Sequence, residues 1–165
     1  MNRSLLSNTR LYFFLMLAIS GAWMMSGCDN NETPEDEVRQ FIQAGSDAVE
    51  KRDISDVRDL IAENYSDARG NNRQMALRML TGYFLGNKNI HVLIDIQHIH
   101  IPDDQHAEVQ LLAGMAGQSA SDFASLFDIR ANVYKFDLRL VKDDDDWQLL
   151  NARWSVASRE DLFGQ

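Results

Sequence analysis

The chain has 165 residues, a length that suits one domain with a single hydrophobic core. Its 25 acidic and 16 basic residues give a formal net charge of −9, and no basic stripe with interleaved aromatic residues is present, so we expect no nucleic-acid binding. Cys28 is the only cysteine, which excludes a disulfide within the chain.

The N-terminal segment predicts a secretory signal. Arg3 and Arg10 accompany an apolar run over residues 11–25, and small residues follow it before Cys28. A basic region, a short apolar region and a junction of small residues are typical of a signal peptide. The alternative is an uncleaved membrane anchor, for which an apolar run of 15 residues is short, because a helical span needs about 20.

The junction Met25–Cys28, with the sequence Met-Ser-Gly-Cys, resembles the lipobox of bacterial lipoproteins. The resemblance implies a signal peptide over residues 1–27, lipidation of Cys28 by more than one acyl chain, and a lipidated tether over residues 28–33. Asp29 follows the cysteine directly. By resemblance to Gram-negative sorting signals, it implies retention at the periplasmic face of the inner membrane, with the outer membrane as the alternative.

The charge of the chain without its signal peptide determines whether electrostatic attraction can hold it at the membrane. Only Arg3 and Arg10 among the charged residues lie in the signal, so its removal leaves 25 acidic and 14 basic residues and a formal charge of −11. Anionic headgroups repel such a surface. We therefore expect the acyl chains, and not a basic patch, to hold the protein at the membrane.

Three helices are predicted within residues 34–86, each from an apolar stripe at three- and four-residue spacing behind a capping residue. In the first helix Thr33 can cap, Pro34 suits the first turn, and the acids that follow meet the positive end of the helix dipole. The second helix is expected to end at residues 64–67 and the third at Gly86. The stripes are Val38, Phe41, Ile42, Gly45, Ala48 and Val49, to about Lys51; Ile54, Val57, Leu60 and Ile61 behind Asp53; and Met75, Leu77, Met79, Leu80, Tyr83 and Phe84 behind Asn72.

After Gly86 the hydrophobic period changes to two, which predicts strands. Turns separate the strands at residues 102–105 and 143–146. Three helices followed by antiparallel strands predict an α+β domain over residues 34–158, with the helices packed on one face of the sheet. Residues 159–165 are expected to form a C-terminal tail. The predicted strands are 90–101, 106–117, 129–142 and 147–158.

Strict alternation along the strands also predicts which side chains share a face. Trp147 and Trp154 are seven residues apart and are expected on opposite faces of the sheet, one buried and one not. His98 and His100 are expected on the same face, and His91 on the other.

Two sequence patterns resemble the nuclear-transport-factor-2-like superfamily: Tyr65–Asp67 between two helices, and Val133–Leu140 followed by the acidic turn and Trp147–Leu149. The resemblance covers residues 34–158. It implies a cone of three helices packed on a curved, four-stranded or slightly larger antiparallel sheet, with a pocket at the open end. Members of the superfamily include ketosteroid isomerases, dehydratases and binding domains without chemistry, so the resemblance bears on fold more than on function.

Asp95 is the candidate for acid–base chemistry, because it lies among apolar residues in the segment 92–96, and apolar surroundings raise the pKa of a carboxyl group. Tyr65 and Tyr83 are candidates for donating a hydrogen bond to an oxyanion. Alternation does not tell which face of the strand that carries Asp95 is inside. A structural role for all three residues is therefore the favoured interpretation.

Metal binding has weak support in the sequence. His98, His100 and His106 could meet an ion, because imidazole suits zinc and copper, but no further ligand stands at a recognisable spacing. The acid run Asp143–Asp146 lacks the alternating ligands, the glycine and the glutamate of a calcium loop. We expect neither a metal nor a cofactor.

The connection over residues 118–128 is longer than a hairpin turn requires. It contains three large apolar residues, Phe123, Leu126 and Phe127, behind a group that can cap a helical turn. These side chains are predicted to fill the core of the protein, to cover a ligand at the mouth of the cone, or to contact a subunit or partner.

The tether and the weak acid–base set favour a membrane-anchored lipoprotein domain that binds a small apolar ligand or an envelope protein without catalysis. The alternative is a small isomerase- or dehydratase-like enzyme with an acid–base residue in the cone pocket. A homodimer through the convex face of the sheet is a further alternative, because Val133 and Val141 place apolar side chains on the face opposite Phe136 and Leu138.

Overall fold

The structure is a computed structural model that describes residues 32–116 and 133–163. Residues 32–165 form one compact unit. Within the described ranges, no helix is both long enough and apolar enough to cross a membrane. The elements are α2 (Pro34–Lys51), α3 (Ile54–Asp59), β1 (Ile61–Asp67), α4 (Arg73–Gly86), β2 (His91–Asp103), β3 (His106–Ala116), β4 (Val133–Asp143), β5 (Asp146–Val156) and α6 (Arg159–Phe163).

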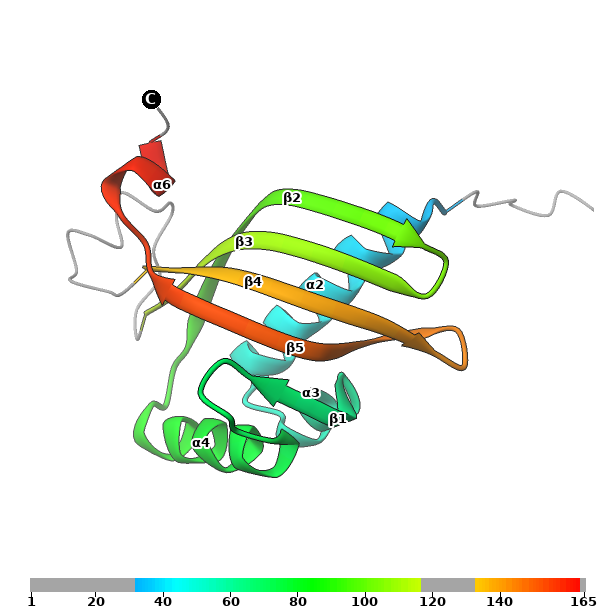
Figure 1. The fold of residues 1–165 in the computed structure, drawn as a ribbon. Coiled ribbons are helices and arrows are strands. Elements are labelled where there is room, and N and C mark those ends of the chain that lie inside the picture. Colours follow the sequence, from blue (N-terminus) through cyan, green and yellow to red (C-terminus); the bar gives the residue numbers. More distant parts are fainter. Residues whose placement is uncertain (1–31, 117–132, 164–165) are drawn as a thin grey trace, which may run out of the picture. The chain divides into compact units, whose positions relative to one another are not determined.

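The strands form one five-stranded sheet in the order β1-β5-β4-β3-β2 (Figure 1). Strands β2 to β5 form an antiparallel meander, and β1 pairs with β5 in parallel. Helices α2, α3 and α4 supply side chains to the hydrophobic clusters on one face, which we call the inner face; the other is the outer face. The α+β class and the helices on one face of the sheet are confirmed, whereas the description of the sheet as entirely antiparallel is wrong.

Strand β1 occupies a segment for which the sequence predicted the end of a helix. Helix α3 stops at Asp59, and the backbone N–H of Leu149 on β5 donates to the carbonyl of Leu60, which starts the parallel pairing. In β1, Ile61 and Tyr65 are buried within a hydrophobic cluster. A short apolar run fits a helix and a strand equally well in sequence, and pairing with a distant strand decides between them.

The predicted helix starts are confirmed. Thr33 caps α2 in a reciprocal box: its hydroxyl accepts from the backbone N–H of Asp36, and the Asp36 carboxylate accepts from the backbone N–H of Thr33. Asp53 caps α3, and Asn72 caps α4 by accepting from the N–H of Met75. Arg52 joins α2 to α3 in the left-handed region at φ 58°.

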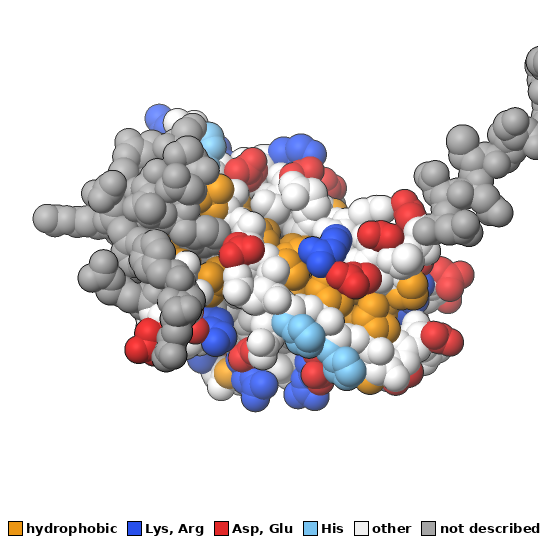
Figure 2. All heavy atoms as spheres, turned by 90° about the horizontal axis from the view of Figure 1, so that it is seen from above, with side chains coloured by type: hydrophobic (Ala, Val, Ile, Leu, Met, Phe, Trp, Pro, Cys, Tyr) orange, Lys and Arg blue, Asp and Glu red, His pale blue; other side chains and the backbone are white. Residues whose placement is uncertain are grey.

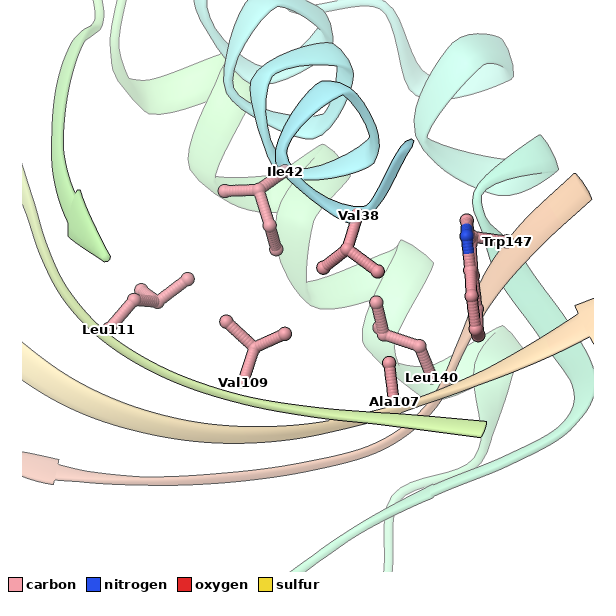
Figure 3. Packing of buried hydrophobic residues seen from close by; sticks show 7 residues of the cluster. All are labelled: Val38, Ile42, Ala107, Val109, Leu111, Leu140 and Trp147. Carbon is pink, nitrogen blue, oxygen red and sulfur yellow. The ribbon is translucent and has the colours of Figure 1, made fainter. Parts of the chain in front are cut away.

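The core lies between α2 and the curved inner face of the sheet (Figure 3). Val38 and Ile42 project from α2 toward Val109 and Leu111 of β3, while Leu140 lies beside them on β4. Full burial of one such aliphatic side chain contributes about 1.5–3 kcal/mol. The second cluster joins α3, α4, β1 and β5 and includes Ala48, Val57, Ile61, Tyr65 and Ala152.

Two β-bulges correct the predicted faces. In β5, Leu149 pairs with Leu140 and Asn151 with Arg139, so Leu150 is an extra residue. The extra residue reverses the alternation, and both tryptophans, Trp147 and Trp154, pack on the inner face. The prediction of opposite faces for them is wrong.

The second bulge lies in β2, where Ile96 pairs with Leu111 and His98 pairs with Gln110. Gln97 is the extra residue. As a result, His91, before the bulge, and His98, after it, share the outer face. The expectation that His91 faces the other way from His98 and His100 is wrong for this reason.

Glu37 links the start of α2 to the β4–β5 hairpin. Its Oε2 accepts from the Lys142 ammonium at 2.7 Å and from Trp147 Nε1 at 3.1 Å. The hydrogen bond from Lys142 holds the pKa of Glu37 below its ordinary value, and the same bond raises the pKa of Lys142. The pair is thus charged at neutral pH and fixes the position of the hairpin against α2.

Candidate functional site

Asp95 lies on the outer face of the sheet and is exposed. It pairs across the strands with Leu112, and its Oδ2 accepts a hydrogen bond from the side chain of Gln97. A general base inside the cone has to be on the inner face, away from water. Asp95 is therefore in the wrong place for the role considered from the sequence.

The two candidate tyrosines lie elsewhere. Tyr65 is buried on β1 within the second cluster, and Tyr83 is half-buried on α4. Strands β1 and β2 are the two edges of the sheet, so four strand spacings, about 19 Å along the sheet, separate Tyr65 from Asp95. The structure does not bring these candidates into one site.

Tyr65 is expected to ionise only at high pH. Its burial and the charge of Asp67 raise the pKa of Tyr65 to about 12, from an ordinary value of 10.0 that applies in the unfolded chain. The contribution of this neutral phenol to the free energy of unfolding should be complete below pH 10 and should be lost as pH rises toward about 12, because only the unfolded state ionises there. Ultraviolet titration checks this: Tyr65→Phe should lack the phenol that titrates last. A Tyr65 that ionises together with the other tyrosines would contradict the burial.

Asp67 is a buried carboxylate with a structural role. Its Oδ1 accepts from the backbone N–H groups of Arg69 and Asn71, and its Oδ2 accepts from the Asn71 amide at 2.8 Å. Burial alone would raise the pKa of Asp67, but the hydrogen bonds from Asn71 and Arg69 hold it below the ordinary value. The carboxylate fixes the turn before α4, which Gly70 completes at φ +79°.

A set of half-buried aromatic rings on β4 and β5 continues the core toward the surface. Phe136 and Trp154 are cross-strand partners whose ring centroids lie 6.1 Å apart at 29°. Tyr134 meets Phe136 edge to face, with centroids 6.4 Å apart. Val156, the cross-strand partner of Tyr134, is 67% exposed. We call Tyr134, Phe136, Trp154 and Val156 the aromatic patch.

Arg69 places a positive charge beside this patch. Its guanidinium carbon lies 5.0 Å from the centroid of the Trp154 ring, within the range of a cation–π contact. Apolar rings that are only half-buried, with a cation over one of them, suit a planar apolar molecule that carries an acidic group. Strand alternation predicts Tyr134 and Phe136 on one face, but the bulge at Leu150, which brings Trp154 to the same face, has no sign in the sequence.

The sequence also singles out two further sets of residues. Phe123, Leu126 and Phe127 lie outside the described residues, so their role stays a prediction. His106 bonds to Asp103 through Nδ1 at 2.9 Å. Among the residues that the structure describes, no three His, Cys, Asp or Glu side chains are grouped so as to hold a metal ion.

The outer face of the sheet bears on the predicted homodimer. In two rows of paired residues that run across β2, β3, β4 and β5, every outer-face side chain is polar. The apolar Val133 is buried within the chain. Figure 2 shows a side of the molecule on which acidic and basic side chains are interspersed, with hydrophobic side chains exposed between them. A homodimer stays a prediction. The polar rows are His98, Gln110, Asp137 and Arg153, and His100, Glu108, Arg139 and Asn151.

No protein-family model matches the sequence, and no curated protein is similar to it. Solved structures are similar in fold. Bd1075 of Bdellovibrio bacteriovorus gives a TM-score of 0.61 at 15% identity, over 74% of this chain and 40% of that one, so this chain spans less than half of Bd1075. A nuclear-transport-factor-2-like (NTF2-like) protein of unknown function from Shewanella oneidensis gives 0.55 at 16% identity, over 74% of this chain and 99% of that one.

A third similar structure comes from Streptomyces avermitilis and is an NTF2-like-family protein whose name proposes a dehydratase. Its TM-score is 0.59 at 16% identity, over 76% of this chain and 99% of that one. Identities this low bear on the fold alone. Together with the sheet and its three helices, these similarities show that the chain has an NTF2-like fold.

Proposed function

We propose that this protein is a membrane-anchored lipoprotein whose domain binds a small planar apolar ligand on the aromatic patch without catalysing a reaction. In this proposal, lipidated Cys28 holds the domain at the periplasmic face of the inner membrane. The observation that carries the binding function is the patch itself: three half-buried rings continue the core to the exposed Val156, with Arg69 over Trp154.

The positions of the ionisable groups support binding over catalysis. An acid–base site needs two titratable groups whose surroundings separate their pKa values and which face the same ligand. Asp95 is on the outer face, and Asp67 is occupied by the turn before α4. Neither carboxylate is free to act on a molecule at the aromatic patch.

The size of the patch indicates a modest affinity for one small ligand. A ligand that loses about 150 Å² of apolar surface on the patch would gain about 4 kcal/mol from burial. The translational and rotational freedom that the ligand loses offsets part of this gain, so burial alone should give weak binding. A pairing of an acidic group with Arg69 would strengthen the binding, since a charge-assisted hydrogen bond is worth more than a neutral one.

The test is ligand-observed NMR on the domain of residues 32–165, which contains both hydrophobic clusters, with 2-naphthoate as the probe. Trp154→Ala should weaken binding about fivefold to tenfold, because it removes one stacking ring. Leu85→Ala is the matched control, since Leu85 is 80% exposed on α4 and belongs to neither hydrophobic cluster, and it should bind as the wild type does. Equal binding by the wild type and Trp154→Ala would refute the proposal.

The second candidate is a dehydratase- or isomerase-like enzyme, and the observation that favours it is Tyr65. Its phenol is buried and stays neutral to about pH 12, as a hydrogen-bond donor to a developing oxyanion must. The two functions differ in what happens to a bound molecule. A ligand extracted from the purified protein should be recovered unchanged after incubation with fresh protein under the binding proposal, and converted, in a manner that Tyr65→Phe abolishes, under the enzyme proposal.

A further inference from the structure

A groove of about 630 Å³ lies between α3 and α4, with β1 beside it, apart from the aromatic patch. Its lining contains three arginines, Arg58 on α3 and Arg73 and Arg78 on α4, and a single acid, Glu63 on β1. Three positive groups and one negative group give the lining a formal charge of +2, in a chain whose net charge is −9. The groove is thus a local concentration of positive charge on an acidic protein.

Arg73 is held rigidly in this groove. Its Nη2 donates to the backbone carbonyl of Arg58 at 2.8 Å, and its Nη1 bonds to the carboxylate of Glu63. Its Nε is buried and has no hydrogen-bond partner in the described part of the chain. A buried donor without an acceptor is costly, so the contacts of Nη1 and Nη2 must outweigh that cost to keep Arg73 in this position.

Arg58 and Arg78 are the free charges of the groove. Both side chains are exposed, and neither forms a hydrogen bond or an ion pair with the described residues. Asp56 and Asp59 are on the same helix as Arg58, but neither lines the groove. Two unpaired guanidinium groups beside a third repel one another, so the arrangement favours the entry of an anion.

The start of α4 adds to this positive field. The first turn of α2 carries three acids, whereas α4 begins with Arg73 and has no acid in its first turn. The positive end of the helix dipole therefore faces the same groove as the arginines, with no acidic residue of its own turn to balance it. This contribution adds to the charge of the arginines and does not by itself define a site.

We propose that the groove binds the phosphate group of a phosphate monoester, either a soluble phosphorylated molecule or the headgroup of a phospholipid. Guanidinium groups match phosphate oxygens in bidentate geometry, which a single ammonium group does not. Arg58 and Arg78 contact the phosphate, and Arg73, which Glu63 and the Arg58 carbonyl hold in place, adds its positive charge. Ile54 and Leu77, which also line the groove, contact the apolar part of the molecule.

The test is isothermal titration calorimetry on the domain of residues 32–165, at constant ionic strength, with glycerol 3-phosphate as the probe. Saturable binding is expected for the wild type. Arg58→Gln and Arg78→Gln should each weaken it about tenfold, because each removes a charge-assisted hydrogen bond. Neither side chain has a partner in the described chain, so the melting temperature should not change. Arg139→Gln, which removes an exposed arginine from the outer face, is the matched control and should bind as the wild type does.

A second arm identifies the source of the phosphate. The same domain is sedimented with vesicles of phosphatidylcholine alone and of phosphatidylcholine mixed with phosphatidic acid in equal parts. Binding of glycerol 3-phosphate indicates a soluble ligand, and binding only to the vesicles with phosphatidic acid indicates a headgroup; both support the proposal if Arg58→Gln and Arg78→Gln reduce them. Binding of neither probe, or binding that the two variants leave unchanged, would overturn it.

Discussion

Trp147→Ala is expected to lower the free energy of unfolding by about 3–5 kcal/mol, the range for removal of a large buried aromatic side chain. Trp147 is 7% exposed and packs in the first cluster with Val38 and Leu140. Its Nε1 also donates to Glu37, so the substitution weakens the link between α2 and the β4–β5 hairpin. Urea unfolding followed by circular dichroism measures the change as a lower transition midpoint.

Two further variants separate the causes of this loss. Trp147→Phe keeps an aromatic ring but removes the donor to Glu37, and should cost less than Trp147→Ala. Trp154→Ala should also cost less, because Trp154 is only half-buried at the aromatic patch. Equal small losses for Trp147→Ala and Trp154→Ala would mean that β5 does not pack against α2 as described.

Cys28→Ser is expected to abolish acylation completely, because only a thiol can be the lipidated nucleophile of a lipobox. The precursor should then accumulate with residues 1–27 attached. Metabolic labelling with a fatty-acid analogue, followed by gel analysis, measures both outcomes. Ser26→Ala is the control, since it keeps a small residue at the junction and should retain the label. Equal label in the wild type and Cys28→Ser would remove the anchor from the proposed function.

The local features of the fold were predictable from the sequence. Thr33, Asp53 and Asn72 cap helices because a short polar side chain reaches the free N–H groups of the first turn, which depends on neighbouring residues alone. The same holds for the hairpin between β4 and β5, where Asp144 and Asp145 adopt positive φ values in an acidic turn. Such signals need no knowledge of the distant chain.

The features that depend on distant pairing were not predictable in this way. Strand β1 forms because Ile61–Asp67 pairs in parallel with β5. No residue pattern within that segment predicts this pairing. The bulges at Gln97 and Leu150 each insert one residue, and a one-residue shift reverses every later side chain in the strand. This is why the sequence predicts opposite faces for Trp147 and Trp154, although both lie on the inner face, and why the aromatic patch was missed.

The same difference between local and distant signals applies to the candidate sites. Asp95 among apolar neighbours resembles a buried base in sequence, yet those neighbours alternate between the two faces and Asp95 faces outward. The arginines of the α3–α4 groove are spread over 20 residues of sequence, from Arg58 to Arg78, and only the packing of α4 beside α3 and β1 gathers them. Charge spacing along the chain gives no sign of that arrangement.

Chemical-shift mapping of the domain of residues 32–165 with 2-naphthoate shows whether the aromatic patch is the ligand-binding surface. The largest shifts should fall on the ring signals of Tyr134, Phe136 and Trp154 and on the side chain of Arg69, and Trp154→Ala should remove them. Shifts centred on the outer face around Asp95, or no saturable shift at the aromatic patch, would contradict this role of the patch.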